Sequence, residues 1–234
     1  MNTQMLARLV LCGFAVVFEL AAQGEDPRLL QQVIEVKVAL ETDRVALRQY
    51  TWTEHTEVVI KGDVKRSTDA ICRYDGWGEL QRKPVGEVKP DETPQAMSKR
   101  PLNRKKAETS DYVERAVSLV HTYLPPKPEQ MKYLMENGKA SLGQAGPGKA
   151  EIRFTRYFKE GDSITYTYDP QSKRLLSVFV KSYLATEKDP VTLNAVFESL
   201  PDGTNHLAST ELNGTAKKIQ VKTRNSSYQK LAAQ

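Results

Sequence analysis

The sequence predicts an α+β fold in which a curved antiparallel β-sheet packs on a helical layer. Three patterns carry this prediction. The first is an apolar stripe at helical spacing near the start, and the second is a long period-two segment with a hairpin turn at Lys61-Gly62. The third is a last third made of strand candidates separated by short turns. These intervals leave no room for crossover helices, which indicates an antiparallel meander.

The first 24 residues have the pattern of a secretory signal peptide. Arg8 supplies a positive charge, residues 9–18 (LVLCGFAVVF) form an apolar run, and Ala22-Gln23-Gly24 places small residues at a cleavage site. The run is too short for a stable membrane span. A buried N-terminal helix is the alternative, which Glu19 near the end of the run favours. We expect residues 1–24 to be a signal peptide that is cleaved after Gly24.

Length and cysteine content then indicate one domain, residues 25–234, without disulfides. A chain of this length can bury roughly 70% of its unfolded surface. Cys72 is the one cysteine after the predicted cleavage site, which excludes an internal disulfide and favours a bacterial periplasm over a small extracellular scaffold. The net charge of +5 is compatible with an anionic membrane surface or an acidic partner.

The N-terminal part of this domain is predicted to be a helix followed by a long hairpin. Asp26-Pro27 can cap and start the helix, which ends near Thr42. The period changes to two from Leu47, and the second strand of the hairpin is predicted from Asp63 to Arg82 with breaks at two glycines. Residues that share one face of the first strand are Tyr50, Trp52, Thr56, Val58 and Ile60.

Residues 84–106 are predicted to form a long mobile loop. They contain four prolines and almost no large apolar residue, so burial would not offset the entropy cost of ordering them. A helix is predicted from Asp111 to Leu124, stopped by Pro125-Pro126, and a shorter one from Pro128 to about Asn137. The loop ends in basic residues that suit contact with an anionic membrane surface: Lys99, Arg100, Arg104, Lys105 and Lys106.

The last third contains strands that are apolar on both faces. In residues 174–184, Leu175 and Phe179 alternate with Leu176, Val178 and Val180. A strand with one wet face does not have this pattern, so both faces require a cover. One face can pack on the helices, and the other can face a curved part of the sheet or a cavity. The strand candidates are 150–158, 162–168, 173–184, 191–199, 205–212 and 216–224.

In its order of elements the chain resembles the LolA/LolB-like group of periplasmic lipoprotein-carrier proteins. These elements are a signal peptide, a helix (Pro27–Glu41), a hairpin around Lys61-Gly62, an interrupting helical segment (Asp111–Gly138) and a meander to the C-terminus. The resemblance covers nearly the whole mature chain. It implies an open half-barrel with helices as a lid, and the carriers of this group hold acyl chains in the cavity between the two.

The sequence contains no recognisable catalytic or metal-binding pattern. Nucleophile-elbow, Walker and dinucleotide motifs are missing, and the histidines have no second ligand at metal spacing: His55, His121 and His206. Asp69 and Asp75 share a predicted strand face but lie about 20 Å apart, which is too far for paired carboxylates. Cys72 has two interpretations, a reactive thiol or, more simply, a small apolar strand residue. We expect no cofactor, no metal and no nucleic-acid partner.

The leading functional hypothesis is an exported, non-enzymatic binding or carrier protein of the periplasm. It would hold a lipid or an acylated partner between the curved sheet and the helices. An envelope protein-interaction or sensor module is the alternative, and an enzyme with a dispersed site stays open. Aromatic residues suit the grip of an amphipathic ligand, although a core aromatic pair would look the same. The predicted cavity wall consists of Tyr50, Trp52, Trp77, Val117, Val120 and Phe179.

The signal-peptide hypothesis has a direct test. If signal peptidase cuts after Gly24, the exported protein begins at Glu25, and N-terminal sequencing of material from the cell envelope reads from that residue. Exported material that still begins at Met1 would contradict the hypothesis.

Overall fold

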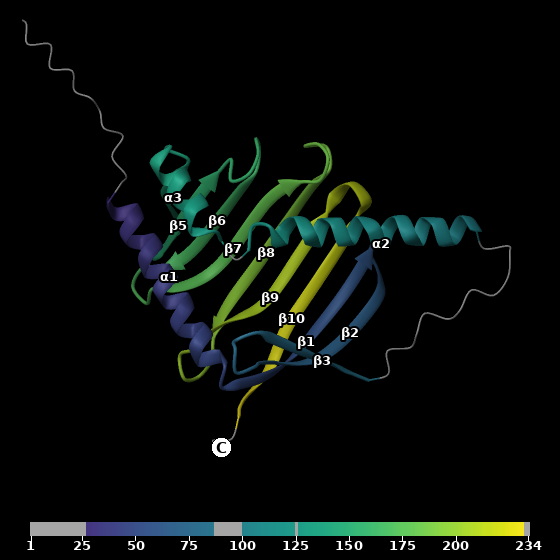
Figure 1. Ribbon diagram of the computed structural model, residues 1–234, viewed down its shortest axis with the longest axis horizontal. Helices are drawn as coiled ribbons and strands as arrows, with labels where there is room; N and C mark the ends of the chain where they lie inside the picture. Colours follow the sequence, from purple (N-terminus) through teal and green to yellow (C-terminus); the bar gives the residue numbers. More distant parts are fainter. Residues whose placement is uncertain (1–26, 87–99, 125, 232–234) are drawn as a thin grey trace, which may run out of the picture.

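A computed structural model describes residues 27–86, 100–124 and 126–231, which form a curved antiparallel sheet with helices on one face (Figure 1). Within these residues the sheet has ten strands in the order β3-β2-β1-β10-β9-β8-β7-β6-β5-β4. The predicted α+β class is confirmed. The strands are β1 (Tyr50–Ile60), β2 (Asp63–Tyr74), β3 (Leu80–Val85), β4 (Ala140–Gly146), β5 (Lys149–Thr155), β6 (Ser163–Asp169), β7 (Arg174–Tyr183), β8 (Pro190–Ser199), β9 (Asn205–Gly214) and β10 (Ile219–Lys230).

The α-helices lie on the concave face of the sheet, which we call the inner face (Figure 1). They are α1 (Pro27–Leu47), α2 (Arg100–His121) and α3 (Pro128–Glu136), and a short 3-10 turn (Thr215–Lys217) precedes β10. The main contacts of α1 are with β7 and β9, those of α2 with β8 and β9, and those of α3 with β5. No helix in the described part of the chain is long and apolar enough to cross a membrane.

The segment predicted as a mobile loop, residues 84–106, differs from the prediction at both ends. Pro84 and Val85 belong to β3, and α2 begins at Arg100, not at Asp111. Proline is tolerated at both places: β3 is an edge strand, and Pro101 lies in the first turn of α2, where a backbone N–H has no partner within the helix. Residues 87–99, including Lys99, lie outside the described residues, as do the side chains of residues 100–106.

The meander also differs in detail from the prediction. The region 63–82 forms β2 and the start of β3, separated by a turn, because Asp75 and Gly78 reverse the chain there. An additional strand, β4, precedes the predicted ones, and β10 continues to Lys230. The sequence of β4 is rich in glycine and alanine, so it shows no alternation of apolar and polar residues that would predict a strand.

The core lies between the inner face of the central strands and the helices. Antiparallel register places Phe154, Ile164, Val180, Leu193 and Leu212 side by side across five strands. Each of these side chains is at least nine-tenths buried. Ala116 and Val120 of α2 and Leu29 and Val36 of α1 belong to the same cluster. Burial of this apolar surface is the main favourable contribution to the stability of the fold.

Two tyrosines fix α2 and the residues just after it to the sheet. The Tyr112 hydroxyl donates to Asp189 Oδ1 at 2.6 Å, and its ring packs on Gly214, where an added Cβ would lie 2.5 Å from ring carbon Cε1. The Tyr123 hydroxyl is 2.5 Å from Asp162 Oδ2 and 2.9 Å from Ser182 Oγ. A glycine at 214 therefore lets the helix approach closely, and polar contacts hold both ends of this stretch.

The Tyr123 anchor generates a stability prediction. Tyr123 is 0% exposed and Asp162 2%, so Tyr123→Phe removes one donor to a buried carboxylate and the hydrogen-bond partner of the Ser182 hydroxyl. We expect Tyr123→Phe to lower the free energy of unfolding by about 1–3 kcal/mol in urea titrations. Tyr133→Phe, at a side chain that is 57% exposed, is the matched control with little expected change. Equal stability of both variants would contradict the anchoring role.

Candidate functional site

The helices cover only part of the inner face, and the sequence changes where the cover ends. One register row runs across the sheet through Tyr166, Val178 and Ala195 and continues as Thr210, Thr223, Thr56 and Thr68. The apolar members are buried, whereas Thr210, Thr223 and Thr56 are half-buried and Thr68 is exposed. Threonine suits a strand and keeps a hydroxyl for water. The row therefore marks an inner-face region, from Thr210 of β9 across β10 and β1 to β2, that the described helices leave partly open.

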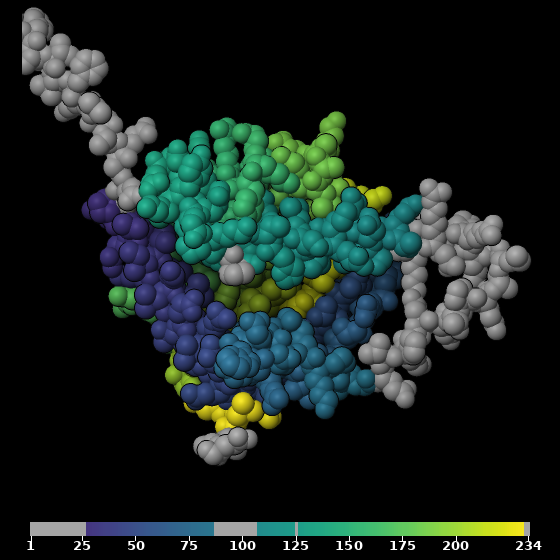
Figure 2. Space-filling view, viewed as in Figure 1, coloured from purple at the N-terminus to yellow at the C-terminus, as the bar shows by residue number. Residues whose placement is uncertain are grey.

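Figure 2 shows this region as a hollow between α1, α2 and the β2–β3 hairpin, with the yellow C-terminal strands at its bottom. We call it the hollow and take the four threonines as the middle of its floor. Towards the β1–β2 turn the floor becomes apolar, because Val58 lies beside Val221 and Val221 beside Leu212. Val58 and Val221 are half-buried. The floor is thus apolar at one end and hydroxyl-lined in the middle.

An ion pair lies on the same face, next to the threonines. Glu54 lies two residues before Thr56 in β1, so both side chains are on the same face. Arg82 Nε of β3 is 2.8 Å from Glu54 Oε1. The Glu54 side chain is 14% exposed, whereas that of Arg82 is 53% exposed. This pair links the first strand to the edge strand on the inner face.

Aromatic side chains close the opposite end of the floor and form what we call the aromatic cluster: Tyr50, Trp52, Tyr74, His206 and Tyr228. Trp52 stacks on Tyr228 at a centroid distance of 5.4 Å and tilts against Tyr74 at 5.5 Å. His206 meets Tyr228 edge-on at 4.3 Å. Such pairs add to the stabilisation from area burial alone. The cluster therefore holds the N- and C-terminal strands together at this end.

Hydrogen bonds extend the cluster to the β8–β9 turn. The Tyr50 hydroxyl donates to Asp202 Oδ2 at 2.5 Å, and Lys230 Nζ lies 2.9 Å from the same oxygen. These contacts, the Tyr50 hydrogen bond first, hold the pKa of the Asp202 carboxyl well below its usual range. Asp202 therefore stays ionised and joins β1, β10 and the turn before β9.

Some buried polar atoms around Tyr228 have no hydrogen-bond partner among the described residues. They are Trp52 Nε1, His206 Nδ1 and Asn225 Oδ1. Burial lowers the pKa of His206, so its ring is neutral near pH 7. Unsatisfied buried donors and acceptors are costly and uncommon. All three atoms are fully buried inside the packed cluster, so a buried water is the partner that fits them.

Cys72 lies beside Trp52 and is 0% exposed. Burial raises the pKa of its thiol to about 11, so the thiol is protonated at neutral pH. The packing interpretation of this cysteine, as a small apolar strand residue, accounts for both observations.

The sequence-predicted wall residues do not form one group. Tyr50 and Trp52 lie together in the aromatic cluster, each 6% exposed, and Val117 and Val120 pack with the core beneath α2. Trp77 is 89% exposed at the tip of the β2–β3 turn. Phe179 alternates with the buried Val178 and Val180, so it lies on the outer face, where it is 41% exposed. A period-two pattern with apolar residues at every position does not say which set faces the helices.

A group of polar residues on the outer face was not predicted from the sequence. His55 Nδ1 lies 2.7 Å from Asp69 Oδ1, and His55 Nε2 lies 3.4 Å from Glu57 Oε1 and 3.5 Å from Ser67 Oγ. Residue types match a Ser-His-Asp triad, but Nε2 is shared with a carboxylate and the side chains lie exposed on strand faces. A nucleophile requires a dedicated base and oxyanion donors. We assign this group a cross-strand electrostatic role.

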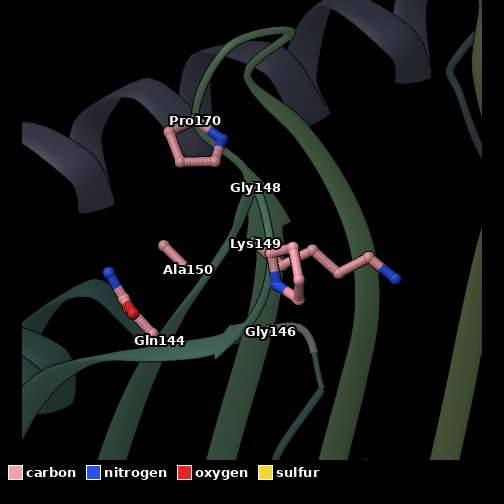
Figure 3. A pocket seen from close by; sticks show the side chains of 7 residues that line it. Gln144, Gly146, Gly148, Lys149, Ala150 and Pro170 are labelled. Carbon is pink, nitrogen blue, oxygen red and sulfur yellow. The ribbon is translucent and has the colours of Figure 1, made fainter.

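A separate pocket of about 520 Å³ lies at the β4–β5 turn (Figure 3). Glycines, prolines and an alanine form most of its wall, and Gln144 and Lys149 are its polar side chains. It brings together no pair of groups with complementary chemistry.

Comparisons with known proteins find distantly similar solved structures and no sequence family. No family model matches the chain, and no curated protein matches it. A DUF1329 family protein from Desulfovibrio piger is similar with TM-score 0.41 and 12% identity, over 86% of this chain and 94% of that one. A LolA superfamily protein from Nitrosomonas europaea is similar with TM-score 0.37 and 7% identity, over 85% and 94% of the two chains.

A third similar structure is an outer membrane lipoprotein-sorting protein domain from Vibrio parahaemolyticus, with TM-score 0.35 and 10% identity over 87% and 94% of the two chains. All three likenesses have TM-scores below 0.5. They assign no residue and no ligand.

The outer-face histidine gives a testable pH dependence. Its hydrogen bond to Asp69, and secondarily to Glu57, raises the pKa of His55 above its ordinary value of 6.5. A raised pKa in the folded state means that the pairing stabilises fully below pH 6.5 and that this stabilisation is lost as the pH rises through the raised value.

We expect an NMR titration of the His55 ring to give a midpoint above 6.5, and Asp69→Asn to move that midpoint down. Asn213→Asp, which is not among the contacts of His55, serves as a control for a change of charge elsewhere on the strands. A midpoint at or below 6.5 in the unmodified protein would show that the pairing does not persist in solution.

Proposed function

We propose that this protein is an exported, periplasmic binding or carrier protein that holds an amphiphile in the hollow. The observation that carries the proposal is the uncovered half of the inner face. Helices pack on β5, β7, β8 and β9, while β10, β1, β2 and Thr210 of β9 leave threonine and valine side chains partly open beside α1 and α2. No catalytic role is assigned to any residue.

The ligand class follows from the chemistry of the floor. Val58 and Val221 offer an apolar surface, the threonines offer hydroxyls, and the packed rings of the aromatic cluster end the floor. This order suits a molecule with an apolar chain and a polar end. An acyl chain of a lipid or a lipoprotein has that construction.

Magnitudes set a lower limit on chain length. Each buried methylene contributes about 0.8 kcal/mol, whereas association costs roughly 4 kcal/mol or more in lost translational and rotational freedom. Several buried methylenes only offset that cost, so a short chain gives no useful affinity. A chain long enough to extend along the floor buries more methylenes than this cost requires and therefore binds. This favours fatty acyl groups over small apolar solutes.

A protein-interaction or sensor module is the second candidate, and the middle of the floor favours it. Four threonines in a row and the Glu54–Arg82 pair are suited to a polar peptide as well as to a lipid head group. A partner peptide would occupy the threonine-lined middle and leave the apolar end unused. The experiment below separates the two by the ligand that binds.

Filling the hollow tests the carrier proposal. In a Trp77→Phe background, Trp52 is the remaining tryptophan and reports on the aromatic cluster. We expect titration with palmitate or a lysophospholipid to change Trp52 emission and to release or absorb heat in calorimetry. Thr223→Phe places a ring on the floor and is expected to weaken binding by about tenfold or more, because a bulky group excludes the chain.

Lys222→Phe is the matched control, because Lys222 directly precedes Thr223 in β10 and its side chain points to the other face of the sheet. Its affinity for the amphiphile is expected to equal that of the parent. If no amphiphile binds to the folded parent protein, or if both variants bind as the parent does, the hollow is not the lipid site and the protein-interaction candidate takes its place.

A further inference from the structure

Helix α1 has a second apolar face that does not pack on the sheet. Leu29 and Val36 are buried against the core, at 5% and 6% exposure. Other apolar residues recur about one or two turns apart on a different side, and these are exposed: Leu30 at 37%, Ile34 at 47%, Val38 at 60% and Val45 at 58%. We call these four residues the α1 stripe. A monomer gains nothing by exposing such a row to water.

Trp77 lies near the C-terminal end of the same helix. An added Cβ on Gly78, the residue directly after Trp77, would lie 2.6 Å from the guanidinium of Arg48, which follows α1. The turn is also well held, because Asp75 Oδ1 accepts hydrogen bonds from the Trp77 and Glu79 amides, both at 2.9 Å. The most exposed large apolar side chain of the described residues therefore stands on a fixed turn.

The charges beside the α1 stripe are mainly positive. Lys37, Arg44 and Arg48 are exposed on or just after the helix. The exposed acids are Glu41 on the stripe side and Glu79 in the turn beside Trp77, whereas Glu35 pairs with Lys173 at 3.4 Å and Asp43 Oδ1 accepts a hydrogen bond from the Asn205 amide. Tryptophan is favoured at membrane interfaces, and lysine and arginine beside an apolar helix face attract anionic head groups.

We propose that the α1 stripe and Trp77 form a docking surface for an anionic lipid bilayer. Apolar side chains enter the interface, and the three bases contact phosphate groups. A second copy of this chain fits the surface less well, because it would bring the same three bases together. This inference goes beyond the proposed function and stands without it, since docking requires no ligand in the hollow. Figure 2 shows α1 along the edge of the hollow, so a docked protein would have that opening near the lipid.

Vesicle sedimentation tests the proposal with the full mature chain. We expect binding to phosphatidylcholine vesicles that contain phosphatidylglycerol, much weaker binding to pure phosphatidylcholine, and a loss of binding at high salt. The double variant Ile34→Glu/Val38→Glu is expected to bind at least about tenfold more weakly, because two exposed apolar residues become acids on the contact side.

The matched control is Ile71→Glu/Phe179→Glu, which changes two exposed apolar residues away from α1, at 47% and 41% exposure. This variant is expected to bind vesicles with only the small loss that two added acids cause through net charge. Circular dichroism and thermal unfolding confirm that both variants fold, since all four positions are exposed. Thr223→Phe, which fills the hollow, is expected to dock normally and thereby separates docking from ligand binding.

Tryptophan quenching gives a second readout. Brominated lipids are expected to quench the exposed Trp77 in docked protein, and Ile34→Glu/Val38→Glu is expected to reduce that quenching. Failure of the parent protein to bind anionic vesicles at low salt overturns the proposal, and so does an equal loss in both double variants. A dimer in sedimentation velocity that Ile34→Glu/Val38→Glu abolishes, without vesicle binding, overturns it in favour of a second copy.

Discussion

The antiparallel pairing of β1 with β10 is the interaction on which the rest of the structure depends. It joins the N-terminal hairpin strands to the meander over the register Tyr50–Lys230 to Ile60–Ile219. The helices have their main contacts with β5 and β7–β9, so β1, β2 and β3 are held chiefly by this ladder, by the aromatic cluster and by the Glu54–Arg82 pair. Because the sheet extends beyond its helical cover in this way, part of the inner face stays open.

The side chains follow this division of the sheet. Under the helices, the inner-face rows are mainly buried apolar residues, such as Phe154, Ile164 and Val180. Beyond the cover, the same register row continues in threonine, which keeps β propensity and a hydroxyl. A closed core and an open floor are thus built from one continuous sheet. The boundary between them follows from which strands the helices reach, and Tyr112 on Gly214 and Tyr123 on Asp162 fix where α2 lies.

Much of the fold could be predicted from periodicity and turn residues. The shared face of Tyr50, Trp52, Thr56, Val58 and Ile60 and the turn at Lys61-Gly62 follow from local patterns, and the structure has them. The face of Phe179 could not be predicted, because neighbouring positions of β7 are equally apolar and only tertiary contacts choose between them. The N-terminal part of α2 was missed because prolines and charges resemble a loop. Cross-strand groups, such as His55 with Asp69 and Trp52 with Tyr228, depend on register, which a single sequence does not display.

The open part of the inner face is proposed to hold an amphiphile. Native mass spectrometry of protein purified without detergent from its own cell envelope tests this most directly. We expect a second species, heavier by the mass of an acyl-bearing molecule, that is present in the unmodified protein and absent from Thr223→Phe prepared in the same way. Unmodified protein that carries no such molecule, or a bound species that Thr223→Phe retains in full, would contradict the claim.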